Sequence, residues 1–162
     1  MRDQRFIAVH RGGPLDRENH AFLVRWAADC AKHVLPLFVR TTADPRPLQA
    51  IEIAHKWADG EVATGVAMRA SVAAHAAARQ ATDKAAIAAA RSAGHAVATA
   101  HFADHSMGAL LYALQALDAS GRPWVPELES RLARLPAHLR EPVADGVDIR
   151  LRRMISADSL VD

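Results

Sequence analysis

The centre of the chain, from about Val62 to Ala119, is a tract dominated by alanine. Alanine has the highest intrinsic helix propensity, because its side chain loses no rotamer freedom in a helix. Helices whose surfaces carry Ala and Gly can also pack near the lower end of the usual interaxial range of about 8–10 Å. The tract therefore predicts closely packed helices, and nowhere in the chain does a convincing strand ladder appear.

Residues that start or stop helices divide the chain into six or seven predicted helices. Pro36 is expected to end or kink the first of them, and Asp44 to cap the second ahead of Pro45. A break is expected at 103–106, which holds two good capping residues. The predicted helices lie at about 18–35, 45–59, within 61–80, from 84 to about 103, at about 106–120, 126–135 and 143–155.

The predicted fold is all-α: a compact single-domain bundle of about six or seven helices with a close-packed Ala/Gly-rich centre. Residues 1–17 are expected to form an N-terminal arm, extended at 5–10, and residues 18–162 the helical domain. Because each buried alanine contributes little free energy, larger side chains must anchor the bundle. The expected anchors are Trp26, Leu37, Ile51, Trp57, Phe102, Tyr112 and Trp124, and the last helix is expected to turn Val147, Leu151, Met154 and Ile155 inward.

Composition and charge exclude several classes of partner. The formal net charge is only +2, and three arginines near the C-terminus lie close to aspartates, so we interpret this helix face as solvated and predict no nucleic-acid partner. No window approaches about 18 uninterrupted apolar residues, which predicts no membrane span. The single cysteine and the lack of a signal-peptide layout indicate a reducing compartment, and we expect a cytoplasmic protein.

Histidines are the strongest chemical feature of the alanine tract. His101 and His105 have the i, i+4 spacing that places two imidazoles on one helix face, and His75 and His95 are further candidate ligands, so a metal-binding helical-bundle protein or enzyme is one hypothesis. Against it, His95 and His101 lie about 120° apart around a helix. The break expected at 103–106 also takes His101 and His105 off a shared face. We therefore favour no metal or cofactor, and expect His75, His95 and His101 to bond to backbone or carboxylate groups where helices meet.

The remaining histidines are predicted to be structural or exposed. His33 is expected to pair with Asp29 one turn earlier on the same helix. The histidines expected to face solvent are His10, His20 and His138.

Cys30 lies on the apolar stripe of the first predicted helix, together with Phe22, Trp26 and Val34. We interpret it as a small core residue rather than a nucleophile. The sequence contains no nucleophile elbow, phosphate-binding loop, dinucleotide-binding motif or zinc-protease motif. We therefore predict no catalytic residues and no enzyme.

Six segments, taken in order, resemble one protein family. They are VHRGGPLD (9–16), WAADCAKHVLPLF (26–38), DPRPLQAIEIAHKWADGE (44–61), AAHAAAR (73–79), AAARSAGHAVATAHFADHSMGALLYALQAL (88–117) and LPAHLREPV (135–143). In order and spacing they are similar to the all-α immunity proteins of bacterial polymorphic toxin systems, and the resemblance covers most of the chain. The pieces D-x-R-P-x-x-A-I-E and G-H-A-V-A-T-A-H are its most specific parts.

The resemblance implies protective binding, in which an immunity protein sequesters a cognate toxin and blocks its active site or a needed movement. Such a role requires no catalytic residue, and the resemblance implies no metal or cofactor. Arg and Trp are frequent in binding hot spots. The candidate interface residues are Asp44, Arg46, Glu52 and Trp57. These residues can instead serve the fold alone, because Asp44 can cap a helix and Arg46 can pair with Glu52 or Asp29, and this alternative stays open. Small-residue helix faces also suit exchange between chains, so a homodimer is a further hypothesis.

Overall fold

The computed structural model of the chain describes the backbone of residues 2–158 and the side chains of residues 2–153. Within this part, two short 3-10 turns, η1 (Gln4–Phe6) and η2 (Val9–Arg11), precede seven α-helices. The helices are α1 (Arg17–Val39), α2 (Arg46–Ala58), α3 (Thr64–Gln80), α4 (Lys84–Ala98), α5 (His105–Ala119), α6 (Val125–Ala133) and α7 (Ala137–Asp158). The predicted all-α bundle is confirmed. Across the described residues, no helix has both the length and the apolar character needed to cross a membrane.

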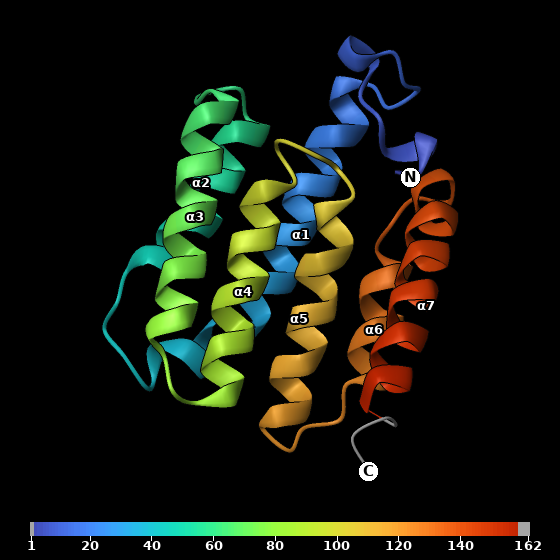
Figure 1. Cartoon of the computed structure of the whole chain (residues 1–162). Helices are drawn as coiled ribbons and strands as arrows, with labels where there is room; N and C mark the ends of the chain where they lie inside the picture. The colour runs from blue at the N-terminus through green and yellow to red at the C-terminus, as the bar shows by residue number, and fades with distance from the viewer. Residues whose placement is uncertain (1, 159–162) are drawn as a thin grey trace.

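The helices run roughly along one axis, with α1 behind α4 and α5 in the middle of the bundle (Figure 1). The α2–α3 pair lies on one side and the α6–α7 pair on the other. The N-terminal arm lies at the same end as the α2–α3 and α4–α5 connections, which we call the arm end. The α1–α2, α3–α4 and α5–α6 connections lie at the opposite end, which we call the far end.

Two prolines lie inside helices, where the sequence predicts boundaries. Helix α1 does not end at Pro36, and α7 begins before Pro142 rather than after it. A proline inside a helix removes one backbone hydrogen bond and costs about 3 kcal/mol. Leu37 and Phe38 after the first proline, and Val143 after the second, are buried in the core. Burial of these side chains outweighs the unfavourable effect of each proline.

The other boundaries follow the local capping signals closely. The first residue of α2 is Arg46, with Pro45 at its N-cap, so the predicted start is off by one residue. Asp44 still accepts a hydrogen bond from the backbone N–H of Arg46, with a nitrogen–oxygen distance of 3.0 Å. A break separates α4 from α5 as predicted, but it begins earlier than the expected 103–106, because the chain leaves α4 at Ala98 and enters α5 at His105.

Helix α4 lies at the centre of the packing, in contact with α1, α2, α3 and α5. Its buried residues are all Ala, Gly, Ser or Val. The buried Ser92 hydroxyl donates to the Ala109 carbonyl oxygen of α5 at 2.7 Å. Side chains this small let several helices approach α4 at once, and many close contacts replace a few large ones. This arrangement is the predicted Ala/Gly-rich centre.

Larger side chains surround this centre. Of the expected anchors, Trp26, Leu37, Ile51 and Trp57 are buried, whereas Phe102, Tyr112 and Trp124 are half-buried. Phe22, predicted on the apolar stripe of α1, is exposed because it faces away from the neighbouring helices. Val147 is buried and Leu151 half-buried, as the inward stripe of α7 requires, while Met154 and Ile155 lie outside the described side chains.

Helix α6 is fixed to α1 by polar contacts. The indole N–H of Trp26 donates to the Arg131 carbonyl oxygen at 2.9 Å. The buried Arg131 guanidinium forms an ion pair with Glu127, with a nitrogen–oxygen distance of 2.6 Å. The buried charge of Arg131 is therefore compensated within α6 itself.

Two glycines of the alanine tract make room for histidine rings. A Cβ atom at Gly94 of α4 would lie 2.7 Å from Nε2 of His75 in α3. A Cβ atom at Gly108 of α5 would lie 2.7 Å from Nδ1 of His95 in α4. Both distances are far below ordinary van der Waals contact. The small residues therefore position imidazole rings between helices, in addition to letting backbones approach.

The N-terminal arm is a compact turn and is not extended as expected. The Val9 N–H donates to the Leu15 carbonyl oxygen at 2.8 Å, and the Leu15 N–H donates to the Ile7 carbonyl oxygen at 3.0 Å. Gly12 turns the chain with a φ of 85°. A Cβ at Gly13 would lie 2.0 Å from the Ile7 carbonyl oxygen, so only glycine fits there. Leu15 is buried in the core, which fixes the arm to the bundle.

We predict that Gly94→Ala lowers the free energy of unfolding by about 1–3 kcal/mol, because the new Cβ displaces the His75 ring from a packed site. Helix propensity alone favours the substitution by about 1 kcal/mol, so a net loss reports the steric effect. Gly65→Ala in α3 is the matched control, because its Cβ would meet only the Arg69 guanidinium at 3.7 Å. Urea unfolding measures both variants, and a Gly94→Ala variant as stable as the parent chain contradicts the prediction.

Candidate functional site

Three of the four candidate metal ligands meet on one face of the bundle, between α3, α4 and α5. The His95 ring lies in the middle, with its centroid 5.1 Å from that of His75 and 5.3 Å from that of His105. The Tyr112 ring stacks on His95 at 5.1 Å, with an interplanar angle of 19°. His105, Gly108 and Tyr112 recur at three and four residues on α5, so they face α4 together. We call His75, His95, His105 and Tyr112 the histidine cluster.

The histidine cluster is arranged for neutral imidazoles. The Nδ1 atoms of His95 and His105 lie 3.2 Å apart, so one ring donates the hydrogen bond and the other accepts it. Burial lowers the pKa of His95 to about 4, and the neighbouring His75 and His105 act in the same direction. Burial also lowers the pKa of His75 and of His105. His95 thus bonds to another imidazole rather than to the expected backbone or carboxylate group.

The four histidines do not assemble around one point. His101 lies apart from the histidine cluster, with its Nδ1 3.4 Å from Nη2 of Arg11 and its ring 4.1 Å from that of Phe102. Among residues with described side chains, no group of three or more His, Cys, Asp or Glu is placed to hold a metal ion. The metal-binding alternative therefore gains no support from the geometry.

Two further histidine predictions are wrong. His20 is only 4% exposed and does not face solvent, because its Nε2–H donates to the Thr99 carbonyl oxygen at 2.7 Å, just after α4. Burial lowers the pKa of His20. His33 pairs with Glu127 of α6 at 3.6 Å rather than with the aspartate one turn earlier, because α6 packs beside α1. His10 and His138 are exposed, as predicted.

The four predicted interface residues do not share one surface. Arg46 pairs with Asp44, with a nitrogen–oxygen distance of 2.9 Å, and also donates to Gln80 at 2.6 Å, both at the far end. Arg46 therefore pairs with neither Glu52 nor Asp29, the two acidic partners that the sequence suggested. Trp57 lies at the other end of α2 and is 6% exposed. Its indole N–H donates to the hydroxyl oxygen of Thr64, the first residue of α3, at 3.0 Å. Glu52 is exposed on α2 between them, and as an interface the set stays a prediction.

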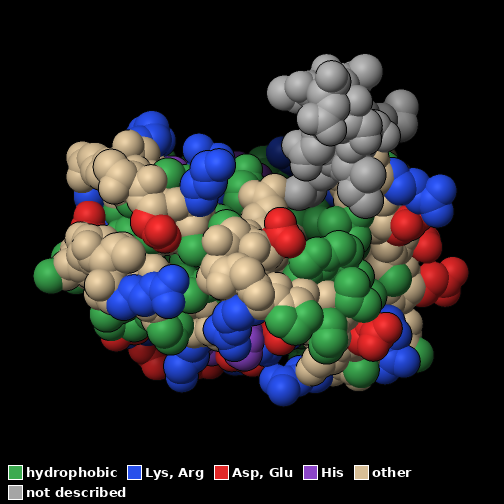
Figure 2. Space-filling model, turned by 90° about the horizontal axis from the view of Figure 1, so that it is seen from below, with side chains coloured by type: hydrophobic (Ala, Val, Ile, Leu, Met, Phe, Trp, Pro, Cys, Tyr) green, Lys and Arg blue, Asp and Glu red, His purple; other side chains and the backbone are tan. Residues whose placement is uncertain are grey.

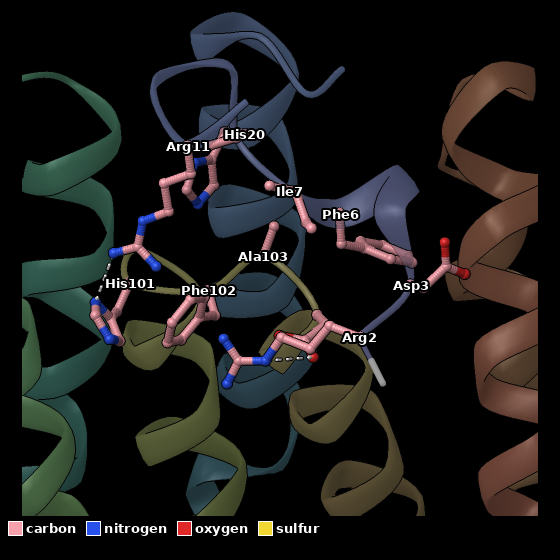
Figure 3. Close-up of a pocket in the computed structure, with 11 residues that line it drawn as sticks. Arg2, Asp3, Phe6, Ile7, Arg11, His20, His101, Phe102 and Ala103 are labelled. Atoms are coloured by element: carbon pink, nitrogen blue, oxygen red, sulfur yellow. Dashed lines mark hydrogen bonds and ion pairs between the residues drawn. The ribbon is translucent and has the colours of Figure 1, made fainter. Parts of the chain in front are cut away.

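The arm end carries a hollow of about 210 Å³ that the sequence analysis did not single out. We call it the arm-end hollow, and its chemistry comes mainly from Arg2, Arg11, His101, Phe102 and Asp104. Figure 3 shows the Phe102 ring between the side chains of Arg11 and Arg2. The guanidinium carbon of Arg2 lies 3.3 Å from the ring centroid, and that of Arg11 lies 4.3 Å from it. Two cations are therefore held against one aromatic ring.

The charges of the two arginines are compensated differently. Nε of Arg2 lies 3.8 Å from a carboxylate oxygen of Asp104. In the described part of the chain, the contacts of Arg11 are with Phe102 and with His101. Burial and the neighbouring Arg11 and Arg2 lower the pKa of His101, so this ring is neutral at pH 7. Arg11 therefore presents a positive charge that no described carboxylate offsets.

A larger hollow of about 730 Å³ adjoins the arm-end hollow, because Ala8 and His20 line both. We call it the arm groove. Its lining includes the buried Trp57 and Val9, which is 59% exposed. The Arg17 guanidinium carbon lies 3.7 Å from the Trp57 ring, and Nη2 of Arg17 donates to the Trp57 carbonyl oxygen at 2.7 Å. The arm end thus combines apolar surface with arginines held by aromatic rings.

The far end has a different character. Figure 2 views the bundle from below, and there positive and negative side chains are interspersed among apolar ones. Asp44 lines a polar hollow of about 320 Å³ together with Gln80, Thr82 and Asp83. In this hollow the Asp44 carboxylate pairs with Arg46, and the Asp83 carboxylate accepts a hydrogen bond from the Ala86 N–H at 2.8 Å, so both carboxylates already have partners within the chain.

Comparison with known families places the chain in a class. The family model described as Imm-5 like putative immunity protein matches residues 13–138. The match extends from the arm turn through α6 to the start of α7. The chain therefore belongs to the Imm-5 like putative immunity protein family, and the resemblance drawn from the six segments is confirmed. No curated protein and no solved structure matches the chain.

We predict that the protein loses stability as the pH falls from about 6.5 to about 4. His20, His75, His95 and His105 have pKa values below the ordinary 6.5 in the folded state, so the unfolded chain binds more protons in this range. For His95, whose pKa is about 4, the loss reaches about 3 kcal/mol at pH 4. Urea midpoints at about pH 7.5 and 4.5 measure the effect.

His95→Gln is expected to flatten this pH dependence, because glutamine does not titrate. His138→Gln serves as the control, since His138 is exposed and its Nε2 lies 2.8 Å from the Asn19 side-chain oxygen, outside the histidine cluster. The prediction fails if His95→Gln and the parent chain lose the same stability over the same pH range.

We predict that the Cys30 thiol does not react with an aromatic disulfide reagent while the protein is folded. The residue is fully buried, so the reagent cannot reach its sulfur atom. Burial also raises the pKa of the thiol, so the reactive thiolate does not form. Absorbance of the released thiolate measures the reaction, with the urea-unfolded chain as the positive control. Complete reaction of the folded protein within minutes would show that the interpretation of Cys30 as a core residue is wrong.

Proposed function

We propose that this protein is an immunity protein, which binds a cognate bacterial toxin in the cytoplasm and neutralises it by protein–protein contact without catalysing a reaction. The observation that carries the proposal is membership of the Imm-5 like family over residues 13–138. Membership of that family implies a toxin partner in general. The polymorphic toxin system, the cytoplasmic location and the inhibitory contact are the parts that we add.

The architecture supports such a role because it orders the arm end before a partner binds, so little conformational entropy is lost on binding. The small-residue packing of α4 and the hydrogen-bonded arm hold the arm end in one conformation. Aromatic rings hold Arg11 and Arg17 at the same end. A binding surface whose side chains are already ordered loses less entropy when a partner docks, and therefore binds more tightly for the same contacts.

We predict that a toxin is encoded immediately upstream of the gene of this chain, and that co-expression of the chain restores the growth of cells that produce this toxin. Sequestration needs one immunity protein per toxin, so rescue is expected to be lost when toxin induction exceeds that of the chain. Growth under two independent inducers measures this dependence. Size-exclusion chromatography of the purified pair is expected to give a complex with equal amounts of both proteins.

An immunity protein from an unrelated toxin pair, produced at the same level, is the control for non-specific relief. Failure of this chain to rescue cells from the upstream toxin, or rescue without a complex, contradicts the proposal. Elemental analysis of untagged protein tests the metal-binding alternative, for which about one equivalent of transition metal is the required result. Light scattering at several concentrations tests the hypothesis of a homodimer.

A further inference from the structure

The arm-end hollow and the arm groove are neighbouring parts of the surface at the arm end, because Ala8 and His20 line both. We infer that this surface binds the toxin and that Arg11 receives an Asp or Glu carboxylate of the toxin there. The inference rests on the proposed function and adds to it the binding surface and the chemistry of the partner.

The first argument is the charge of Arg11. Several arginines of this chain pair with a carboxylate of the chain itself, namely Arg5, Arg25, Arg46 and Arg131. Among the described residues, Arg11 contacts the Phe102 ring and the neutral His101 ring instead. Asp3, a carboxylate of the same hollow, is already bound by Arg5 at 2.7 Å. A carboxylate of a binding partner would therefore give Arg11 the acidic partner that it lacks among the described residues.

The second argument is the position of the two guanidinium groups over the Phe102 ring. A cation–π contact occupies none of the N–H groups of a guanidinium as a hydrogen-bond donor to a carboxylate, so they stay available for a two-pronged contact with one. Nη2 of Arg11 contacts His101 at 3.4 Å, a long bond that a charged acceptor would displace. Arg2 adds a second positive charge beside the same Phe102 ring, as Figure 3 shows, and Asp104 at 3.8 Å offsets it in part.

The third argument is the apolar surface next to Arg11. The arm groove measures about 730 Å³, and its lining includes Trp57 and the exposed Val9. Arg17 is already held over Trp57, so it loses little freedom when a partner docks. Arginine and tryptophan are enriched at the hot spots of protein–protein interfaces, where they lie in apolar pockets from which the bound partner excludes water. The groove therefore suits an apolar side chain that neighbours the carboxylate in the toxin.

The charge balance at the arm end favours a protein partner over a nucleic acid. Asp3, Asp16 and Asp104 line the two hollows together with the arginines. A nucleic acid presents phosphates in a row and requires a continuous basic face, which these aspartates interrupt. A folded protein that presents one carboxylate beside one apolar side chain matches Arg11, whose guanidinium lies beside the groove without a carboxylate partner among the described residues.

Titration calorimetry tests the inference with the toxin domain encoded immediately upstream, carrying an inactivating substitution in its active site. Arg11→Glu is expected to weaken binding at least about thirtyfold, and Arg11→Ala at least about tenfold. Phe102→Leu keeps both arginines but removes the ring that holds them, and is expected to weaken binding several-fold. Raised salt is expected to weaken the parent complex more than the Arg11→Ala complex.

Arg122→Glu is the matched control, because Arg122 is exposed in the α5–α6 connection at the far end and the charge change is the same. It is expected to change the dissociation constant less than about threefold. Thermal melts establish that each variant is folded. A charge-reversed toxin, in which an exposed Asp or Glu is Lys, that restores binding to Arg11→Glu would support the inference and identify the paired carboxylate.

Each contrary outcome separates the inference from the proposed function. Binding that is unchanged by Arg11→Ala, or weakened equally by Arg11→Glu and Arg122→Glu, overturns the inference and leaves toxin binding intact. A parent chain that does not bind the upstream toxin overturns both. If Arg11→Ala alters only dimerisation of this chain, or only its binding to a fluorescent single-stranded oligonucleotide, the occupant is a second copy or a nucleic acid and the carboxylate assignment is wrong.

Discussion

The packing of this bundle depends on the small cross-section of α4. Ala86, Ala89, Ala90 and Ala93 of this helix have no exposed surface, and α1, α2, α3 and α5 pack around it. Each alanine buries little area, so the cohesion of the centre is the sum of many dispersion contacts at short range. A larger side chain at any of these positions would separate several helices at once. No buried side chain of α4 is larger than valine, and the larger buried side chains of the core lie on other elements.

The same constraint explains where the histidines lie. Imidazole rings enter the centre only where Gly94 and Gly108 leave space, and there they pack against each other rather than against carboxylates. The His95 carbonyl oxygen accepts a hydrogen bond from the Thr99 hydroxyl at 3.0 Å, and the Thr99 carbonyl oxygen accepts one from His20 at 2.7 Å. Because His20 lines both hollows, the end of α4 connects the histidine cluster to the arm end.

Local signals predicted the helices but not the surface at the arm end. The break near residue 104 and the alanine tract depend on propensity and capping within a few residues, and both were found. His20 was missed, although it lies three and seven residues before the buried Leu23 and Ala27 and so shares their helix face. Its partner Thr99 is 79 residues away in the chain, and His101 is 90 residues from Arg11. No periodic pattern encodes such contacts, and we expected residues 5–10 to be extended, whereas the arm folds back at Gly12 and Gly13.

The residues that stabilise this fold and the residues at its arm end are chemically separate sets. The centre is built from Ala, Gly, Ser and Val, which offer a partner no charge, and the hydroxyl of the buried Ser92 already donates to Ala109. Arg11 lies outside that centre, is exposed, and has no carboxylate partner among the described residues, so its replacement removes little from folding. Arg17 differs, because it holds the Trp57 backbone and ring and thus contributes to both. Because Arg11 is separate from the residues that pack around α4, a substitution at Arg11 can change which partner is bound without repacking α4. A protein that must match one particular partner requires such independence.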